Sequence, residues 1–160
     1  MRSVLRVGLF GCTAVAALAG VRTAQGQVTL TLSSAPAVFP APTAADYTAG
    51  VVSDPTGIGF TITVGGPKAA RTSIVFIRST SAVLGGTKPL SDLEWRRADL
   101  ATWTPMSLTD ATIESRPIVK NQTNDPWSNQ VLFRIRLSWT ADPPATYAAN
   151  LVFTLTVTTP

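Results

Sequence analysis

The side chains that most often perform chemistry in proteins are scarce in this sequence. Its 160 residues include no histidine and a single cysteine, Cys12. Without histidine the chain lacks the commonest general base and the commonest metal ligand, which excludes Ser/His/Asp and Cys/His nucleophiles and most zinc sites. Among the carboxylates only Asp92 and Glu94 lie close together, whereas a glycosidase holds two carboxyl groups about 5 to 9.5 Å apart across a cleft. We therefore expect a protein that is not an enzyme and that uses no cofactor.

Asn121, Asn124 and Asp125 offer the oxygen ligands that calcium prefers. Calcium takes about six to eight oxygen ligands, usually from a loop with a regular ligand spacing. The spacing of these three residues matches no such loop, and the Asn-Asp-Pro sequence that ends at Pro126 is an ordinary turn signal. The sequence therefore predicts no metal site.

Four tryptophans are the remaining candidates for a binding surface. An exposed aromatic ring can stack on the face of a sugar, and aromatic side chains serve binding surfaces generally. Trp95 and Trp139 alternate with polar neighbours in predicted strands, so we expect both in the core, while the place of Trp103 stays open. Trp127 lies in the polar segment 121–129. It is the one tryptophan that we predict to be displayed on the surface, where it would bind a ligand such as a glycan.

Composition and alternation predict an all-β fold for the elements that carry these residues. The chain is 45% apolar and only 14% charged, with 12 prolines and 11 glycines, a mixture that favours strands and turns over helices. Strand patterns occupy residues 28–32, 47–52, 58–64, 71–80, 93–97, 102–106, 111–120, 131–139 and 147–157. With turn signals between them, they predict an antiparallel, immunoglobulin-like β-sandwich of about seven to nine strands. A β-barrel is the alternative fold. Residues 92–100 could alternatively form a single helical turn instead of a strand.

Two of these strands carry information about their place in a sheet. Residues 74–77 are apolar on both faces, which is typical of a central strand that is covered on both sides or of one that shifts register at a bulge. Pro117 interrupts the 111–120 segment, and proline is confined to edge strands because it donates no hydrogen bond to a neighbour. We expect a central position for the first strand and an edge position for the second.

The N-terminus has the pattern of a secretory signal peptide. Arg2 and Arg6 form a basic start, residues 7–21 are uncharged and mostly apolar, and Ala24-Gln25-Gly26 supplies small residues for cleavage before Gln27. The apolar run is shorter than the ~20 residues of a membrane-spanning helix. We therefore expect residues 1–26 to be removed and residues 27–160, the mature chain, to form one domain without a transmembrane segment. Its location would be secreted, periplasmic or on the cell surface.

Removal of the leader changes the charge and the cysteine count. The whole chain holds 13 basic and 9 acidic residues. Three of the basic residues, Arg2, Arg6 and Arg22, precede Gln27, and no acidic residue does. The mature chain is therefore nearly neutral. Its basic residues are scattered among acids, which argues against a nucleic-acid partner. The single cysteine also belongs to the leader. The mature chain must therefore be stabilised by core burial, without disulfides, in an oxidising compartment.

The C-terminal segment carries a resemblance to a known family. Residues 142–157 read DPPATYAANLVFTLTV, in which Tyr147 enters a long strand after a proline-containing turn, as in the tyrosine corner of immunoglobulin-like sandwiches. This segment resembles the terminal strand of secreted bacterial pilin-type domains, including spore-coat-U-like proteins, a family built of incomplete immunoglobulin-like sandwiches. Two features depart from the family: the mature chain lacks the cysteine pair of many such subunits, and no clear Phe-Gly element follows the first strand.

The resemblance implies a function in assembly. A sandwich that lacks its closing strand exposes a backbone ladder that another chain can complete by strand addition. Val28, Leu30 and Leu32 alternate at period two near the mature N-terminus and would form the exchanged strand. We therefore expect a structural or interaction protein of the cell envelope, assembling as a fimbrial-type subunit through self-association or protein partners. In the alternative, residues 28–32 pair within their own sheet and the protein is a monomeric, secreted ligand-binding module.

Overall fold

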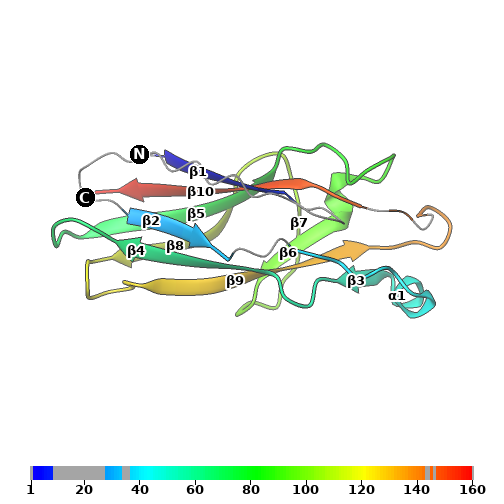
Figure 1. Cartoon of the computed structure of the whole chain (residues 1–160), viewed down its shortest axis with the longest axis horizontal. Coiled ribbons are helices and arrows are strands. Elements are labelled where there is room, and N and C mark those ends of the chain that lie inside the picture. Colours follow the sequence, from blue (N-terminus) through cyan, green and yellow to red (C-terminus); the bar gives the residue numbers. More distant parts are fainter. Residues whose placement is uncertain (1, 9–27, 34–36, 143–144, 146, 160) are drawn as a thin grey trace.

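The chain forms two antiparallel sheets that pack face to face as an all-β sandwich (Figure 1). The computed structural model describes residues 2–8, 28–33, 37–142, 145 and 147–159. Sheet A has the order β1 (Arg2–Gly8), β10 (Asn150–Thr158), β5 (Arg71–Ser79) and β8 (Ala111–Ile118). Sheet B has the order β2 (Val28–Leu32), β4 (Ile58–Val64), β9 (Trp127–Arg136), β6 (Leu93–Arg97) and β7 (Thr104–Pro105), and β3 (Val51–Ser53) also pairs with β9. The sandwich prediction is confirmed, and the barrel alternative is wrong.

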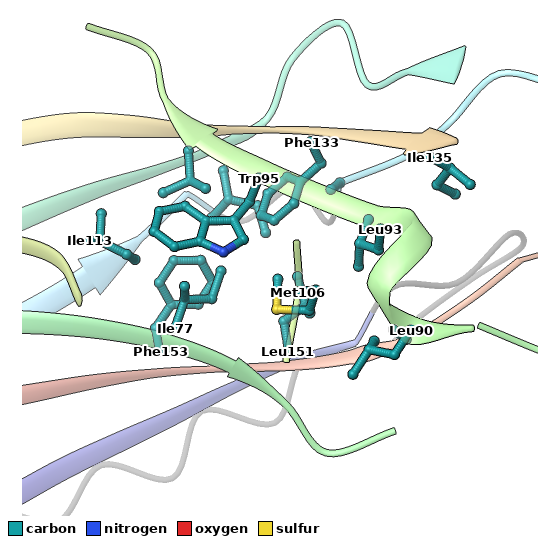
Figure 2. Packing of buried hydrophobic residues seen from close by; sticks show 14 of the residues in the cluster. Ile77, Leu90, Leu93, Trp95, Met106, Ile113, Phe133, Ile135, Leu151 and Phe153 are labelled. Carbon is teal, nitrogen blue, oxygen red and sulfur yellow. The ribbon is translucent and has the colours of Figure 1, made fainter. Parts of the chain in front are cut away.

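Alternate residues of the central strands build the core between the two sheets. Ile58, Phe60 and Ile62 of β4 are buried while the residues between them face outward, which is the period expected of a half-buried strand. Figure 2 shows Trp95 of β6 between the sheets, among side chains from both of them. Phe153 on β10 is fully buried in the same cluster. The prediction that Trp95 belongs to the core is therefore confirmed.

The two strands with positional signals lie where the sequence places them. β5 pairs with β10 on one side and with β8 on the other, and its register to β8 shifts between Val75 and Phe76. β8 contains Pro117 and pairs with β5 alone in the described part of the chain. The central position of β5, the register shift in its pairing with β8 and the edge position of β8 are confirmed.

The segment predicted as a strand at 47–52 is a short helix followed by a short strand. Helix α1 (Ala44–Ala49) begins with a capping box, in which the Thr43 hydroxyl accepts from the Asp46 N–H and the Asp46 carboxylate accepts from the Thr43 N–H. It ends at Gly50, whose φ of 73° suits a residue without a side chain. Local capping therefore overrides the apolar pattern, and β3 starts only at Val51. A 3₁₀ turn, η1 (Leu90–Asp92), precedes β6.

The two long C-terminal strands are displaced from their predicted bounds. β9 begins at Trp127 rather than Val131 and ends at Arg136, and β10 begins at Asn150. A turn stops β9, because the Asp142 N–H donates to the Ser138 carbonyl and the Ser138 N–H donates to the Asp142 carboxylate. Trp139 lies in this turn with 62% of its surface exposed. The prediction that Trp139 is a core residue is therefore wrong.

Part of the predicted leader forms a strand: residues 2–8 are β1. The predicted cleavage point before Gln27 lies outside the described residues. The backbone of β1 pairs with β10 without interruption, from Arg2 opposite Thr156 to Gly8 opposite Asn150. Among the described elements, β1 therefore supplies the neighbour of β10 on the side away from β5.

Candidate functional site

The outer edge of β10 pairs with β1 and lacks the residues that usually protect a sheet edge. Inward residues Leu151, Phe153 and Leu155 are buried and hold the strand against the core. Its sequence NLVFTLTVT contains no charged residue and no proline, which are the usual devices that prevent an edge strand from pairing with other chains. β1 occupies this edge over seven residue pairs. In the absence of β1, the described strands leave β10 paired with β5 alone.

The predicted exchange segment, Val28, Leu30 and Leu32, forms β2 within the chain's own sheet. β2 pairs with β4 from Val28 opposite Val64 to Leu32 opposite Phe60. The three apolar side chains are half-buried and pack against the core. The chain's own sheet therefore already uses this strand, as the alternative interpretation expected.

Trp127 is not in a loop, because it is the first residue of β9. Its ring is half-buried against the core, and the guanidinium of Arg116 lies 3.6 Å from the ring centroid. The indole Nε1 is buried and has no hydrogen-bond partner among the described residues. Trp127 is therefore a shielded side chain in the space between β8 and β9, and its ring face is taken by an arginine.

The polar segment before Trp127 is held by its own hydrogen bonds. The Asp125 carboxylate accepts from the Val64 N–H at 2.8 Å and from the Asn121 N–H at 2.6 Å. These backbone bonds lower the pKa of Asp125 below its ordinary value. The amide of Asn124 donates to the Pro117 carbonyl at 2.7 Å. These bonds tie the β8–β9 connection to both sheets, with the Asp125 carboxylate as acceptor and the Asn124 amide as donor.

A buried lysine lies at the end of the sandwich that carries η1. The Lys88 side chain is 2% exposed, and its Nζ lies 2.7 Å from Asp142 Oδ1 and 2.9 Å from Asp92 Oδ2. Burial of the ammonium lowers the pKa of Lys88, but its hydrogen bonds to the two carboxylates raise it more, and the pKa lies above its ordinary value. The ammonium also lies 5.3 Å from the ring centroid of Tyr147. This cluster joins the connection before β6 to the connection before β10.

A tyrosine corner combines a tyrosine near the start of a strand with a hydrogen bond from its hydroxyl to a backbone group. In this chain these two features are found on two different tyrosines. The sequence predicts Tyr147 at the start of the last strand, whereas β10 begins only at Asn150. Burial together with the nearby Asp142 charge raises the pKa of Tyr147. The hydroxyl that donates to a distant backbone carbonyl, however, is that of Tyr47, at 3.0 Å from the Asp142 carbonyl. Tyr47 stacks on Trp139, with ring centroids 4.7 Å apart. Sequence reasoning missed this aromatic pair, because Tyr47 was assigned to a strand and Trp139 to the core.

The carboxylates that were nearest in sequence serve different partners. Asp92 contacts Lys88, whereas Glu94 accepts from Arg134 Nε at 2.6 Å. Arg134 in turn lies against the ring of Trp103, 4.5 Å from its centroid. No group of three or more histidine, cysteine, aspartate or glutamate residues within the described ranges could hold a metal ion.

No family model, curated protein or solved structure matches this chain. Within the part of the chain that the structure describes, no helix has the length and apolar character needed to cross a membrane. Any function must therefore be argued from the geometry of the edge and surface described above.

Proposed function

We propose that this protein is a secreted structural or interaction protein of the cell envelope that associates with other chains by strand addition at β10. In this proposal residues 1–26 are a signal peptide, and their removal on export vacates the edge of β10. The observation that carries the proposal is the pairing of β10, on the side away from β5, with residues 2–8. Those residues belong to the segment that the sequence marks as a leader.

The chemistry of the edge supports an extended peptide as the occupant. A strand added to β10 would gain backbone hydrogen bonds along the ladder, and alternate side chains would give it specificity. β10 runs over Asn150–Thr158 without charge or proline, so it offers a long, unprotected template. This arrangement agrees with the incomplete immunoglobulin-like sandwich that the C-terminal resemblance implies.

The source of the added strand is constrained by β2. Residues 28–32 are paired with β4 and packed on the core of their own chain, so donating them to a second copy vacates the edge of β4. A reciprocal exchange of β2 between two copies would fill both β10 edges and leave both β4 edges open, so each copy would lose its β2–β4 pairing. A strand from a different envelope protein would leave β2 in place. Self-association that is lost on deleting residues 27–33 would identify β2 as the donor.

The direct test adds the missing strand in trans. The mature chain, residues 27–160, is mixed with a synthetic peptide of residues 2–8, and the control is the same peptide with Leu5→Pro, which removes a backbone donor at its centre. We expect the first peptide to raise the melting temperature with its concentration, because a ligand of the folded state stabilises that state by mass action. The proline peptide should have little effect.

Light scattering on the mature chain alone supplies the second readout. Oligomers that grow with concentration and disappear when the residue 2–8 peptide is added would support strand addition at β10. A mature chain that stays monomeric at high concentration and does not respond to the peptide would refute it. That outcome would favour the monomeric ligand-binding module.

A further inference from the structure

Trp139 is a large aromatic side chain that is mostly exposed to solvent. The exposed large apolar side chains within the described residues are Val38, Val83, Leu100, Leu108 and Trp139. The other four are aliphatic, and each lies in a different connection between strands or helices. Trp139 is aromatic and follows the C-terminal end of β9, at the end of the sandwich where Figure 1 shows α1. The exposed ring must therefore be explained by its own surroundings rather than by a wider apolar patch.

The ring is held in place by a partner that is itself fixed. Tyr47 of α1 is buried and stacks on Trp139 at a centroid distance of 4.7 Å and an interplanar angle of 29°. The Tyr47 hydroxyl donates to the carbonyl of Asp142, which fixes the tyrosine to the far end of the Trp139 turn. Because Tyr47 covers one face of the indole, the large exposed area of Trp139 belongs to the other face and the ring edge.

The turn that carries Trp139 is also closed at both ends. Ser138 and Asp142 exchange hydrogen bonds, with the Asp142 carboxylate accepting from the Ser138 N–H at 2.8 Å. The second oxygen of that carboxylate accepts from the buried Lys88 ammonium at 2.7 Å. The turn is thus anchored to α1 through Tyr47 and to the connection before β6 through Lys88. A surface ring with this much support is preorganised, so little conformational entropy is lost when a ligand stacks on it.

The chemistry around the ring favours an uncharged, polyhydroxylated ligand. The hydroxyls of Ser138 and Thr140 lie 3.2 Å apart on either side of Trp139 in sequence, and they can donate or accept hydrogen bonds. The nearest buried charges, Lys88 and Asp142, are paired with each other. A flat aromatic face beside hydroxyl groups matches a sugar ring, which presents C–H groups on one face and hydroxyls at its edge.

We propose that Trp139 is the stacking platform of a carbohydrate-binding site for neutral hexose-containing glycans. The site consists of the free face of Trp139, its support Tyr47, and the hydroxyls of Ser138 and Thr140. It does not depend on strand addition, because it uses neither β10 nor β2. It also differs from the site predicted at Trp127, whose ring face is taken by Arg116.

The test measures glycan retention by the full chain and by residues 27–160. Each is applied to an array of neutral oligosaccharides built from glucose, mannose, galactose and N-acetylglucosamine. Trp139→Ala removes the platform, and Leu108→Ala is the matched control because it deletes an exposed apolar side chain, 51% exposed, in another connection. Trp139→Phe keeps an aromatic face. Melting curves of all variants show whether each is folded.

We expect the wild type to retain at least one neutral oligosaccharide, Trp139→Ala to bind it roughly tenfold more weakly, and Trp139→Phe to fall between them. Leu108→Ala should bind as the wild type does. The proposal would be overturned if the wild type retained no glycan on the array. It would also be overturned if a folded Trp139→Ala variant bound the glycan as strongly as the wild type does. A dimer that is lost in Trp139→Ala would also overturn it, because the ring would then be a contact between copies.

Discussion

The two edges of sheet A are protected in different ways. The β8 edge carries a bulge, a proline and side chains that occupy its carbonyls: Arg97 donates to the Ile113 carbonyl, and Asn124 donates to the Pro117 carbonyl. Among the described residues, the β10 edge has no bulge, no proline and no side chain that binds its outer carbonyls, and residues 2–8 fill it instead. Natural sheets use charge, proline and bulges to prevent strand addition. The difference indicates that β8 is a permanent edge and that β10 is suited to accept a strand.

Charged side chains join β8 to sheet B in addition to the buried apolar residues Ile113 and Ile118 of β8. Arg97 of β6 pairs with Glu114 of β8 and also binds Asp99 through two nitrogens, at 2.8 and 2.7 Å. Arg116 covers Trp127. These contacts join sheet B to the β8 edge by specific bonds. On the β10 side, β2 lies close to β10, and neither of these two strands contains a charged residue that could form an ion pair.

The largest expected effect breaks the β8 side. Arg97→Met should lower the free energy of unfolding by about 2 kcal/mol, because the buried Glu114 carboxylate would lose one of its two arginine partners and keep only Arg116, 3.1 Å away. Urea denaturation measures the loss. Arg136→Met is the control, since its side chain is 63% exposed and its contact with Glu94 is 3.9 Å long, and it should cost less than about 0.5 kcal/mol. Equal losses for the two variants would contradict the importance of the Arg97 cluster.

The next effect concerns the β10 edge. Thr156→Lys places a charge on this strand, and charged side chains on an edge oppose strand addition. In the mature chain it should weaken binding of the residue 2–8 peptide roughly tenfold, measured by titration calorimetry, and leave the melting temperature of the peptide-free chain nearly unchanged. Ser115→Lys on the exposed face of β8 should not alter peptide binding. An effect from Ser115→Lys, or none from Thr156→Lys, would place the peptide elsewhere.

A smaller effect is expected where a side chain caps the β8 edge. Asn124 has a φ of 52°, a conformation that aspartate also tolerates. Asn124→Asp therefore keeps the backbone but replaces the amide donor to the Pro117 carbonyl by an acceptor. We expect a loss of about 1 kcal/mol in the free energy of unfolding. A thermal or urea transition identical to that of the wild type would show that water replaces the cap at no cost.

The smallest expected effect is a pH-dependent change in amide protection that differs between the β8 edge and the β10 edge. Hydrogen bonds from Arg97 hold the pKa of Asp99 below its ordinary value of 3.8. Its stabilisation is present above that ordinary value and is lost as pH falls through the lowered pKa. Between pH 5 and about pH 3, amide protection corrected for intrinsic exchange should fall slightly in β6 and β8 and stay constant in β10. Asp99→Asn should remove this difference, and an unchanged pH response in that variant would assign it to another carboxylate.

Local patterns in the sequence were sufficient for much of the fold. β4 and β6 match their predicted ranges because apolar and polar residues alternate in them and turn residues bound them. Pro117 placed β8 at an edge, and the apolar residues of β5 placed that strand centrally. α1 was missed because its apolar residues also fit a strand, although the Thr43 and Asp46 capping box was visible in the sequence.

The candidate surface was harder to predict because alternation says nothing about what covers a strand's end. Trp139 continued the alternation of β9, yet the Ser138–Asp142 turn removed it from the sheet and left it exposed. Trp127 looked exposed among polar neighbours, yet Arg116 from another strand covers it. Both outcomes depend on contacts between residues that are distant in sequence.

By itself, the sequence determined that the chain is all-β, that it has no histidine chemistry, and that residues 27–160 contain no cysteine. These properties follow from composition and from side-chain periodicity, which are local. Only the tertiary structure decided that residues 2–8 lie on the edge of β10, that Lys88 is buried between two aspartates, and that Tyr47 supports an exposed tryptophan. Such contacts depend on pairing between segments distant in sequence, since Tyr47 and Asp142 are 95 residues apart and are brought together where β3 pairs with β9.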